Sequence, residues 1–459
     1  MSESLSNSND FIFFGCWNNI NCSKKEKILN RNVVLALLKK LYSDRPIILA
    51  GDNWYSHNKK KKKILKTLSQ ELIKRKSNLS LIIKKNTKTY SSSIDSLSID
   101  SNVKFYPLYV LETGYRKLFE ISKNIDIILG NHDINSKNLD NFYDLNKCNQ
   151  LGCMIKVQND IIRKILSGDT INKQINDTQP IKNIYHYNDI HLYVCKPEII
   201  QKKTGIYFLY LNTNIFEAKN VESINEYREL VSEKLESIDN KIKLLFIVAH
   251  HPFFGLKKKK GKVSIKNISD LYFKKKVDQI KVNAINDFLH IFNKYKSIYL
   301  CADIHNFQLC KLSSNICMII CGTGGASKDK TNPYVDNPDP IPLSSNLKDD
   351  IKVTDMYVHD SYGFSKINYS DSGNKVKIEY YKIINTDIKY YKFTYILTYT
   401  NKSWNIFRKT HSIKTAFIPN KIDFDTSQHC SKIRAENDDQ INELIATVND
   451  EKCGKKIKD

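Results

Sequence analysis

Five short polar clusters, each directly after a run of apolar residues, constrain this chain more than any other feature of its sequence. The apolar runs have the length and composition of buried β-strands. The clusters are Gly15-Cys16-Trp17-Asn18, Gly51-Asp52-Asn53-Trp54-Tyr55, Gly130-Asn131-His132-Asp133, His250-His251-Pro252 and Ala302-Asp303-Ile304-His305. Since ligands of open α/β sheets gather at the carboxyl ends of strands, we expect the five clusters to meet in one site.

Between the clusters, strand-like runs alternate with longer amphipathic stretches, which is typical of a layered α/β domain. The sequence predicts strands at Phe11–Phe14, Ile47–Ala50, Ile125–Leu129, Ile206–Leu211, Leu244–Ala249, Ser297–Cys301 and Ile316–Cys321. It predicts helices at Lys25–Leu41, Lys61–Lys74, Leu111–Ser122, Val157–Leu166, Val221–Ile238 and Ile280–Asn293. After Tyr362 only strand-like stretches follow, at Phe364–Tyr369, Lys375–Lys382 and Tyr391–Tyr399.

The 459 residues can form one large domain with insertions or two smaller domains. We expect a single domain over residues 10–399 with two insertions: residues 76–101 are basic and then serine-rich, and residues 327–350 contain four prolines. From residue 400 to 459 the apolar pattern thins out, apart from one expected helix near Asp438–Val448. We expect the first insertion and the tail beyond Asn401 to be dispensable for folding of the core.

Composition and the first residues exclude several classes of protein. No run approaches the roughly 18 apolar residues of a membrane helix. The first ten residues lack the basic and apolar regions of a secretion signal, so the sequence predicts a cytoplasmic protein without a membrane partner. The 11 cysteines are dispersed and odd in number, which favours reduced thiols over a disulfide framework.

The formal net charge of +23 raises the question of an anionic partner. Lys, Asn and Ile are abundant and Arg is scarce, as expected when an AT-rich genome sets codon choice. Lysines cluster at residues 59–63, 257–260 and 274–276. We favour solvated loops and helix faces for these clusters, and the alternative is a phosphate-rich partner such as nucleic acid. The oligomeric state is not indicated.

The residue types in the five clusters point to metal chemistry. Oxygen and nitrogen donors that converge in this way suit Mn, Fe and Zn ions. Two such ions about 3.5 Å apart hold an attacking water and a phosphoryl oxygen together during in-line displacement. Glycines before Asp52 and Asn131 permit the sharp turn that presents a side chain at a strand end.

In this order, the clusters resemble the calcineurin-like metallophosphoesterase superfamily, and more closely its purple acid phosphatases. Gly-Asp-Asn-Trp-Tyr is similar to that group's Gly-Asp-Asn-Phe-Tyr, and Gly-Cys-Trp-Asn to its Gly-Asp-Trp-Gly. Residues 304–308 resemble the Asp-His-Asn-Leu-Gln ending of its last motif. The resemblance covers about residues 11–399 and implies an α/β (α+β) fold in which two mixed β-sheets pack as a sandwich flanked by helices.

The resemblance also implies roles for single residues. Asp52 would bridge two divalent or trivalent metal ions (Fe, Zn or Mn); Tyr55 and His305 would bind the first ion, and Asn131 and His250 the second. His132 would contact the substrate as a positioning group or general acid, with Asp133 fixing its orientation. For His251, substrate binding and a structural role are both open.

Two positions depart from the family pattern. Cys16 stands where the family has an aspartate that binds the first metal, and Asp303 stands where it has a histidine that binds the second. A thiolate suits zinc or iron and a carboxylate suits most divalent ions, so both replacements can still bind metal. We therefore expect partial or uneven metal occupancy as an alternative to a full two-metal site.

Two functions follow from this sequence. The first is metal-dependent hydrolysis of a phosphate monoester or diester by a metal-activated water. The alternative is a catalytically degenerate phosphoesterase fold that acts as a binding or structural protein. The intact Gly-Asn-His-Asp and His-His-Pro sequences favour the enzyme, and the replaced ligands favour the alternative.

Overall fold

A computed structural model describes residues 9–19, 30–55, 107–134, 139–140, 143–144, 153–168, 181–259, 262–268, 271, 278–326, 341–342, 351–384 and 389–415. The helix expected at Lys61–Lys74, the insertion at residues 76–101, the helix near Asp438–Val448 and most of the insertion at residues 327–350 lie outside these ranges.

Within the described residues, the larger sheet has nine strands. Their order is β20 (Ser403–Thr415), β19 (Lys389–Thr400), β18 (Lys375–Ile383), β17 (Gly363–Tyr369), β1 (Asp10–Phe14), β2 (Ile47–Leu49), β3 (Ile125–Ile127), β5 (Ile190–Tyr193) and β4 (Ile184–Tyr187). The strands from β1 to β5 in this order are parallel, and antiparallel strands flank them on both sides. The sheet is therefore mixed.

The smaller sheet is also mixed. Its order is β16 (Met356–His359), β12 (Phe307–Lys311), β13 (Ile316–Cys321), β11 (Ser297–Cys301), β8 (Leu244–Val248), β7 (Ile206–Tyr210) and β6 (Glu198–Lys203). The four strands from β13 to β7 are parallel. Two short ribbons complete the strands: β9 (Phe254–Lys259) with β10 (Lys262–Asn267), and β14 (Ile341–Pro342) with β15 (Lys352–Val353).

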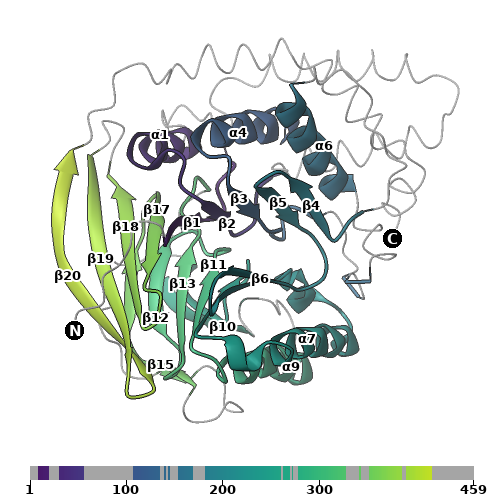
Figure 1. Ribbon diagram of the computed structural model, residues 1–459, viewed down its shortest axis with the longest axis vertical. Coiled ribbons are helices and arrows are strands. Elements are labelled where there is room, and N and C mark those ends of the chain that lie inside the picture. The colour runs from purple at the N-terminus through teal and green to yellow at the C-terminus, as the bar shows by residue number, and fades with distance from the viewer. Residues whose placement is uncertain are drawn as a thin grey trace, which may run out of the picture.

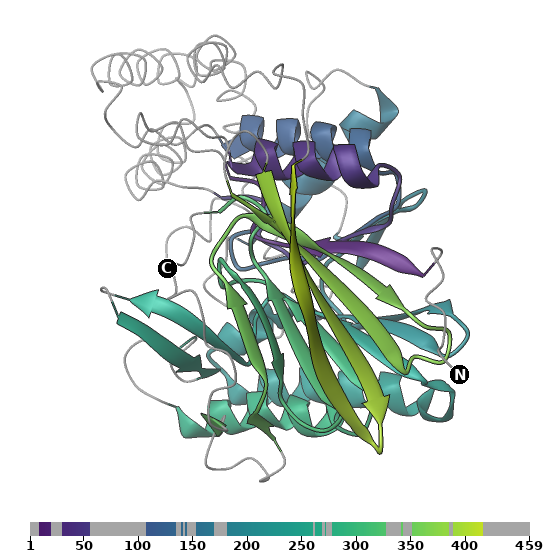
Figure 2. The ribbon, with the colours of Figure 1, turned by 90° about the vertical axis from the view of Figure 1, so that its left-hand side faces the viewer.

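The two sheets pack face to face through apolar side chains. The ring of Phe11 on β1 lies 5.4 Å from the rings of both Phe208 on β7 and Phe246 on β8. Helices α1 (Asn30–Tyr42), α4 (Pro107–Ile121) and α6 (Cys153–Ser167) lie over the outer face of the larger sheet, and α7 (Val221–Glu236) and α9 (Gln279–Phe292) lie over that of the smaller sheet (Figures 1 and 2). The expected fold class, a sandwich of two mixed sheets flanked by helices, is confirmed. In the described part of the chain, we find no helix that is both long and apolar enough to cross a membrane.

The structure corrects the expected tail. Strand β20 lies within it and pairs with β19 along most of its length. Trp404 on β20 is buried, and its Nε1 donates a hydrogen bond to the Asn315 carbonyl 2.9 Å away. Residues 403–415 therefore belong to the larger sheet, so the expected boundary between domain and tail at residue 400 is corrected; whether the core folds without them stays a prediction. Their alternation of polar and apolar residues reflects an edge strand with one solvated face.

A buried carboxylate links the two sheets away from the polar clusters. Asp126 at the centre of β3 is contacted by His191 Nδ1 on β5 and by Lys202 Nζ on β6, each 2.9 Å away. The hydroxyl of Tyr210 on β7 also donates to it. Burial raises the pKa of Asp126, but these three partners outweigh burial and hold it below its usual value.

We predict that Asp126→Asn lowers the free energy of unfolding by about 2–3 kcal/mol at pH 7, because it leaves Lys202 without its buried partner charge. A carboxylate whose pKa is lowered by folding stabilises above its unfolded pKa and loses this effect as pH falls through the folded pKa. The difference from wild type should therefore shrink below about pH 4. Urea unfolding of both proteins between pH 7 and below about pH 4 measures this difference in the free energy of unfolding. Asp371→Asn, which breaks the exposed ion pair with Lys203, is the control. It should leave the free energy of unfolding unchanged within error.

Candidate metal centre

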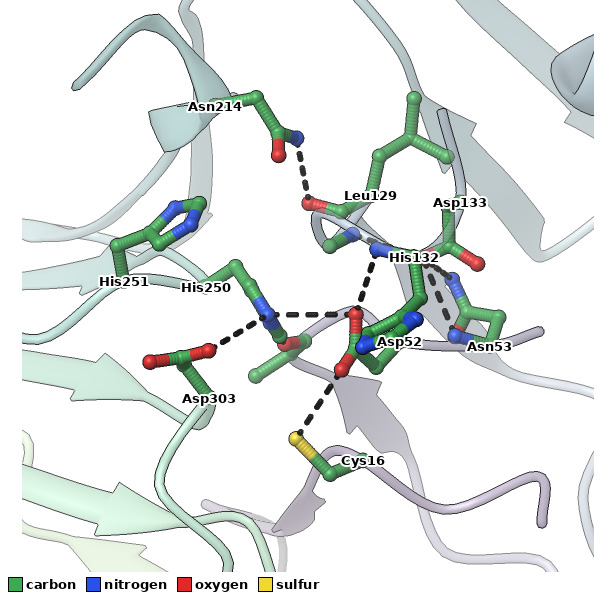
Figure 3. Close-up of polar contacts among 12 residues, drawn as sticks. Cys16, Asp52, Asn53, Leu129, His132, Asp133, Asn214, His250, His251 and Asp303 are labelled. Carbon is green, nitrogen blue, oxygen red and sulfur yellow. Dashed lines mark hydrogen bonds and ion pairs between the residues drawn. The ribbon is translucent and has the colours of Figure 1, made fainter. Parts of the chain in front are cut away.

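The five polar clusters lie side by side where the two sheets present the carboxyl ends of their parallel strands. Three clusters follow β1, β2 and β3 of the larger sheet, and two follow β8 and β11 of the smaller sheet. The Cys16 amide donates to the Gly51 carbonyl, and the Ala302 amide donates to the His250 carbonyl, both at 3.0 Å. Figure 3 shows the side chains of Cys16, Asp52, His250 and Asp303 turned toward one another.

Three of these side chains come from residues in the left-handed backbone region. The φ angles are 50° for Cys16, 55° for Asp52 and 51° for Asp303. Asp visits this region more readily than other non-glycine residues, whereas Cys has no such preference. Such conformations cost about 1–3 kcal/mol each and gather at functional sites, so the turns themselves point to a site at these strand ends.

Asp52 stands at the centre of the cluster, and its two carboxylate oxygens face different partners. Oδ2 lies 3.7 Å from Cys16 Sγ. Oδ1 lies 3.4 Å from His250 Nε2 and accepts a hydrogen bond from the His132 amide at 3.1 Å. Burial raises the pKa of Asp52, but the nearby His250 and His132 lower it more, to about 2. The carboxylate is therefore charged and can be shared between two donor groups.

The first donor group consists of Cys16, Asp52 and His305, whose ligand atoms all lie within 4.8 Å of one another. The Tyr55 ring packs between His132 and His305, with ring centroids 4.7 and 6.3 Å away. Burial and the charge of Asp52 raise the pKa values of both Cys16 and Tyr55. A cation would have to displace the Cys16 proton, as ligating thiols require.

The second donor group surrounds His250. Its Nδ1 lies 2.7 Å from the Ala50 carbonyl and must carry the hydrogen, since a carbonyl only accepts. Burial lowers the pKa of His250, so the ring is neutral and its Nε2 presents a lone pair. That lone pair faces Asp52 Oδ1 at 3.4 Å and Asp303 Oδ1 at 3.9 Å.

His250 Nε2, Asp52 Oδ1 and Asp303 Oδ1 are all hydrogen-bond acceptors. Acceptors that face one another need a cation or a proton between them. Nε2 of His250 is buried without a hydrogen-bond partner among the described residues, and so is Oδ1 of Asn131. A ligating histidine typically donates its other ring N–H to a backbone carbonyl, as His250 does. The side chains on both sides of Asp52 therefore have the chemistry of metal ligands, and Cys16, Asp52 and His305 are close enough together to hold one ion.

Asp133 is hydrogen-bonded to the two turns that carry Asp52 and His132, and its expected effect on the orientation of His132 stays a prediction. Its Oδ2 accepts hydrogen bonds from the Gly130 amide and from both the amide and the side chain of Asn53. Its Oδ1 accepts one from Gln158 on α6. Burial and the charge of Asp52 raise the pKa of Asp133 to about 8. Asp133 thus clamps the turn after β3 to the turn after β2.

His251 is fully buried behind His250, which favours the structural role that the sequence left open. Its Nδ1 lies 3.0 Å from Thr213 Oγ1, and its Nε2 lies 3.8 Å from Glu217. Thr213 also accepts the amides of His250 and His251, so it fixes this turn. Sequence reasoning missed Thr213, although Asn212-Thr213-Asn214 is a further polar cluster directly after an expected strand.

Among the described residues, the candidate centre has a buried side and a partly exposed side. Cys16, Asp52, Tyr55 and His250 are buried, whereas Asn131, His132, Asp303 and His305 are half-buried. His132, beside the Tyr55 ring, thus belongs to the partly exposed side.

Comparisons with known proteins identify no family. A scan against protein-family models and a search of curated proteins found no match. A search of solved structures found matches that include PhoD (9% identity, TM-score 0.46, covering 95% of this chain and 78% of that chain). Others are GAP50, the anchor in the inner membrane complex of Plasmodium (11%, 0.35, 93% and 94%), and the calcineurin-like phosphoesterase YfkN from Bacillus subtilis (11%, 0.29, 94% and 99%).

We predict that Gly130→Ala disrupts the centre. A methyl group there would collide with the Asp52 amide and carboxylate and would lie 2.7 Å from His250 Cε1. The free energy of unfolding should fall by about 1–3 kcal/mol, as in other overpacked sites, and zinc binding should weaken. Urea unfolding and zinc titration measure both effects.

Gly168→Ala is the matched control. Gly168 has a φ of 73°, and an added methyl group would meet nothing within 4 Å, so the cost should be only the roughly 1 kcal/mol of a left-handed residue. Equal stability of the two variants with intact zinc binding would show that the strand ends are less tightly packed than described.

Proposed function

We propose that this chain is a metallophosphoesterase of the calcineurin-like superfamily that hydrolyses phosphate monoesters or diesters. The observation that carries the proposal is the position of Asp52, whose two oxygens face two separate groups of metal donors. One carboxylate between two donor groups is the arrangement that a two-metal phosphoesterase requires. The similarity of the motifs to purple acid phosphatases supports the same proposal.

Cys16, Asp52, Tyr55 and His305 would hold one ion, and Asp52, Asn131, His250 and Asp303 the other. When bound, the two ions would activate a water and neutralise charge on the phosphoryl oxygens. The remaining chemistry belongs to side chains at the open edge. His132 lies beside Tyr55 at the entrance, where it can hold a phosphoryl oxygen or give a proton to the leaving oxygen.

The two ligand replacements give the two positions different preferences. The thiol of Cys16 suits a soft or borderline ion such as zinc. The carboxylate of Asp303 adds negative charge near His250 and suits Mn²⁺ or Mg²⁺ better than an imidazole would. We therefore propose uneven metal content, with zinc or iron beside Cys16.

The second candidate function is a binding or structural protein on a degenerate phosphoesterase fold. The presence of Cys16 in a left-handed turn that suits aspartate favours it, because the backbone there keeps a conformation that its present side chain does not prefer. The two proposals differ in whether purified protein turns over an ester.

We predict that the purified protein hydrolyses 4-nitrophenyl phosphate or bis(4-nitrophenyl) phosphate with Mn, Zn or Fe under reducing conditions. His132→Ala should lower kcat by about 10²- to 10⁴-fold, as loss of a general acid does, without changing metal content. Cys16→Ser should reduce bound zinc and remove the thiolate charge-transfer absorption of the cobalt-substituted protein.

Cys16→Asp and Asp303→His, singly and together, restore the family ligands and are the decisive comparison. An increase in turnover with the double variant would show that the two ligand replacements alone limit the activity of the wild type. If wild type and double variant are both inactive with every metal, the binding-protein proposal replaces the enzyme.

A further inference from the structure

Two histidines lie directly opposite each other on the hairpin of β4 and β5. His186 on β4 pairs with His191 on β5 in the antiparallel register. Residues that pair in this way share one face of the ribbon, with their Cβ atoms about 4.5–5.5 Å apart. The centroids of the two imidazole rings are 5.1 Å apart, and the ring planes meet at 77°. The hairpin therefore holds two imidazoles side by side.

The ring of His191 is held in one orientation by Asp126. Nδ1 of His191 lies 2.9 Å from Oδ1 of Asp126. Since a carboxylate only accepts hydrogen bonds, Nδ1 carries a hydrogen and Nε2 of the neutral ring presents a lone pair. Histidines that bind metal typically donate their other ring N–H to a carboxylate or a backbone carbonyl. His191 therefore has the hydrogen bonding of a metal ligand.

Asp126 is itself fixed by its other contacts. Its Oδ1 accepts a hydrogen bond from the Tyr193 hydroxyl at 3.3 Å, and its Oδ2 contacts both Lys202 Nζ at 2.9 Å and the Tyr210 hydroxyl. Lys202 thus binds the oxygen of Asp126 that His191 does not use. The negative charge of Asp126 offsets that of Lys202 next to the imidazole, which reduces the repulsion that a bound cation would meet.

The histidine pair is accessible to solvent. His186 is exposed, and the side chain of His191 keeps 23% of its surface accessible. Within the described part of the chain, we find no hydrogen bond to the His186 ring, so this ring is able to rotate. A tetrahedral ion with metal–nitrogen bonds of about 2.0–2.1 Å needs two nitrogens about 3.3 Å apart. Rotation of the His186 ring can bring one of its nitrogens to this distance from Nε2 of His191.

The pair lies outside the candidate metal centre, at an edge of the sandwich. β4 is an edge strand of the larger sheet, and β6 is an edge strand of the smaller sheet (Figure 1). The side chain of Asn183, which lies directly before β4, donates a hydrogen bond to Glu198 on β6. Lys202, also on β6, contacts Asp126 on β3. The edges of the two sheets are therefore connected beside the histidine pair.

The ligand type selects the metal. Imidazole nitrogen suits zinc, copper, nickel and iron, whereas Mg²⁺ and Ca²⁺ take oxygen ligands. For a given set of nitrogen ligands, affinity rises from Mn²⁺ to Cu²⁺, and that of Zn²⁺ lies below Cu²⁺. Two imidazoles with water as the remaining ligands therefore favour the late divalent ions of the first transition row.

We propose that His186 and His191 bind one divalent transition-metal ion, of the group Ni²⁺, Cu²⁺ and Zn²⁺, at a site separate from the candidate metal centre. His191 binds through Nε2 and His186 through a ring nitrogen. The ion connects the edge strand β4 to β5 and, through Asp126, to β3 and β6. It stabilises this edge of the sandwich, because the two imidazoles lie together only when the hairpin is formed. The site does not depend on the proposed function.

The test titrates Zn²⁺ into the metal-free full chain with the Asp52→Asn substitution, which removes the carboxylate between the two donor groups of the centre. Adding His186→Ala should raise the dissociation constant of one Zn²⁺ ion about tenfold or more, because a single imidazole loses the advantage of chelation. Calorimetry measures this constant. With Cu²⁺ as the probe, electron paramagnetic resonance should show one coordinated imidazole nitrogen fewer after His186→Ala. Zn²⁺ should also raise the Tm of the Asp52→Asn protein more than that of the double variant.

His290→Ala in the same Asp52→Asn background is the matched control. His290 is a half-buried histidine on α9, over the outer face of the smaller sheet. Its loss should change the dissociation constant by less than about twofold, because distant sites without shared partners act independently. Since His186 is exposed, His186→Ala should melt at the same temperature as its parent when no metal is present, which shows that weaker binding does not come from misfolding.

Equal dissociation constants before and after His186→Ala would overturn the proposal. An equal weakening by His290→Ala would overturn it as well, since zinc binding would then belong to histidines in general. If the wild type hydrolyses no ester and the effect of His186→Ala on zinc binding persists, the enzyme proposal fails and the hairpin site stands.

Discussion

The structure depends on the close approach of strand ends from two different sheets. Gly51 and Gly130 lie so near each other and His250 that a single added methyl group would collide with backbone or ring atoms. Only at this separation can the two oxygens of Asp52 face Cys16 on one side and His250 on the other. The aromatic packing of Phe11 against Phe208 and Phe246 fixes the spacing of the two sheets behind the site. Packing of the core thus sets the distances between the polar side chains at the strand ends.

The hydrogen bonds around the candidate site hold the turns at the strand ends in place. Asp133 and Thr213 each accept hydrogen bonds from amides of turns that carry a candidate metal ligand. Both lie one layer behind the side chains that face the opening. Rigid second-layer contacts of this kind are what keep a donor set in place when its turns are conformationally costly.

Much of this arrangement could be predicted from the sequence, because buried parallel strands are short apolar runs and their polar clusters follow directly. The other strands carry weaker signals. β9 and β10 read as a lysine-rich loop, and β20 alternates polar and apolar residues with one face in water, as a solvated stretch also can. The role of Thr213 and the hydrogen bonds of Asp133 to the turn after β2 could not be predicted, since they depend on which turns meet in space. The left-handed backbone of Cys16 was equally hidden, because cysteine itself has no preference for it.

The pairing of β1 with β17 has a consequence for how the chain acquires its structure. Phe11 pairs with Ile367, so the first strand of the larger sheet receives its second neighbour from near the far end of the described chain. During synthesis from the N-terminus, β1, β2 and β3 can associate early, but one side of β1 keeps unpaired backbone groups until β17 is available. Contacts of such long sequence separation slow folding and leave a strand edge open to other chains in the meantime. The strand that leads to Cys16 in the candidate metal centre is thus among the last to be enclosed.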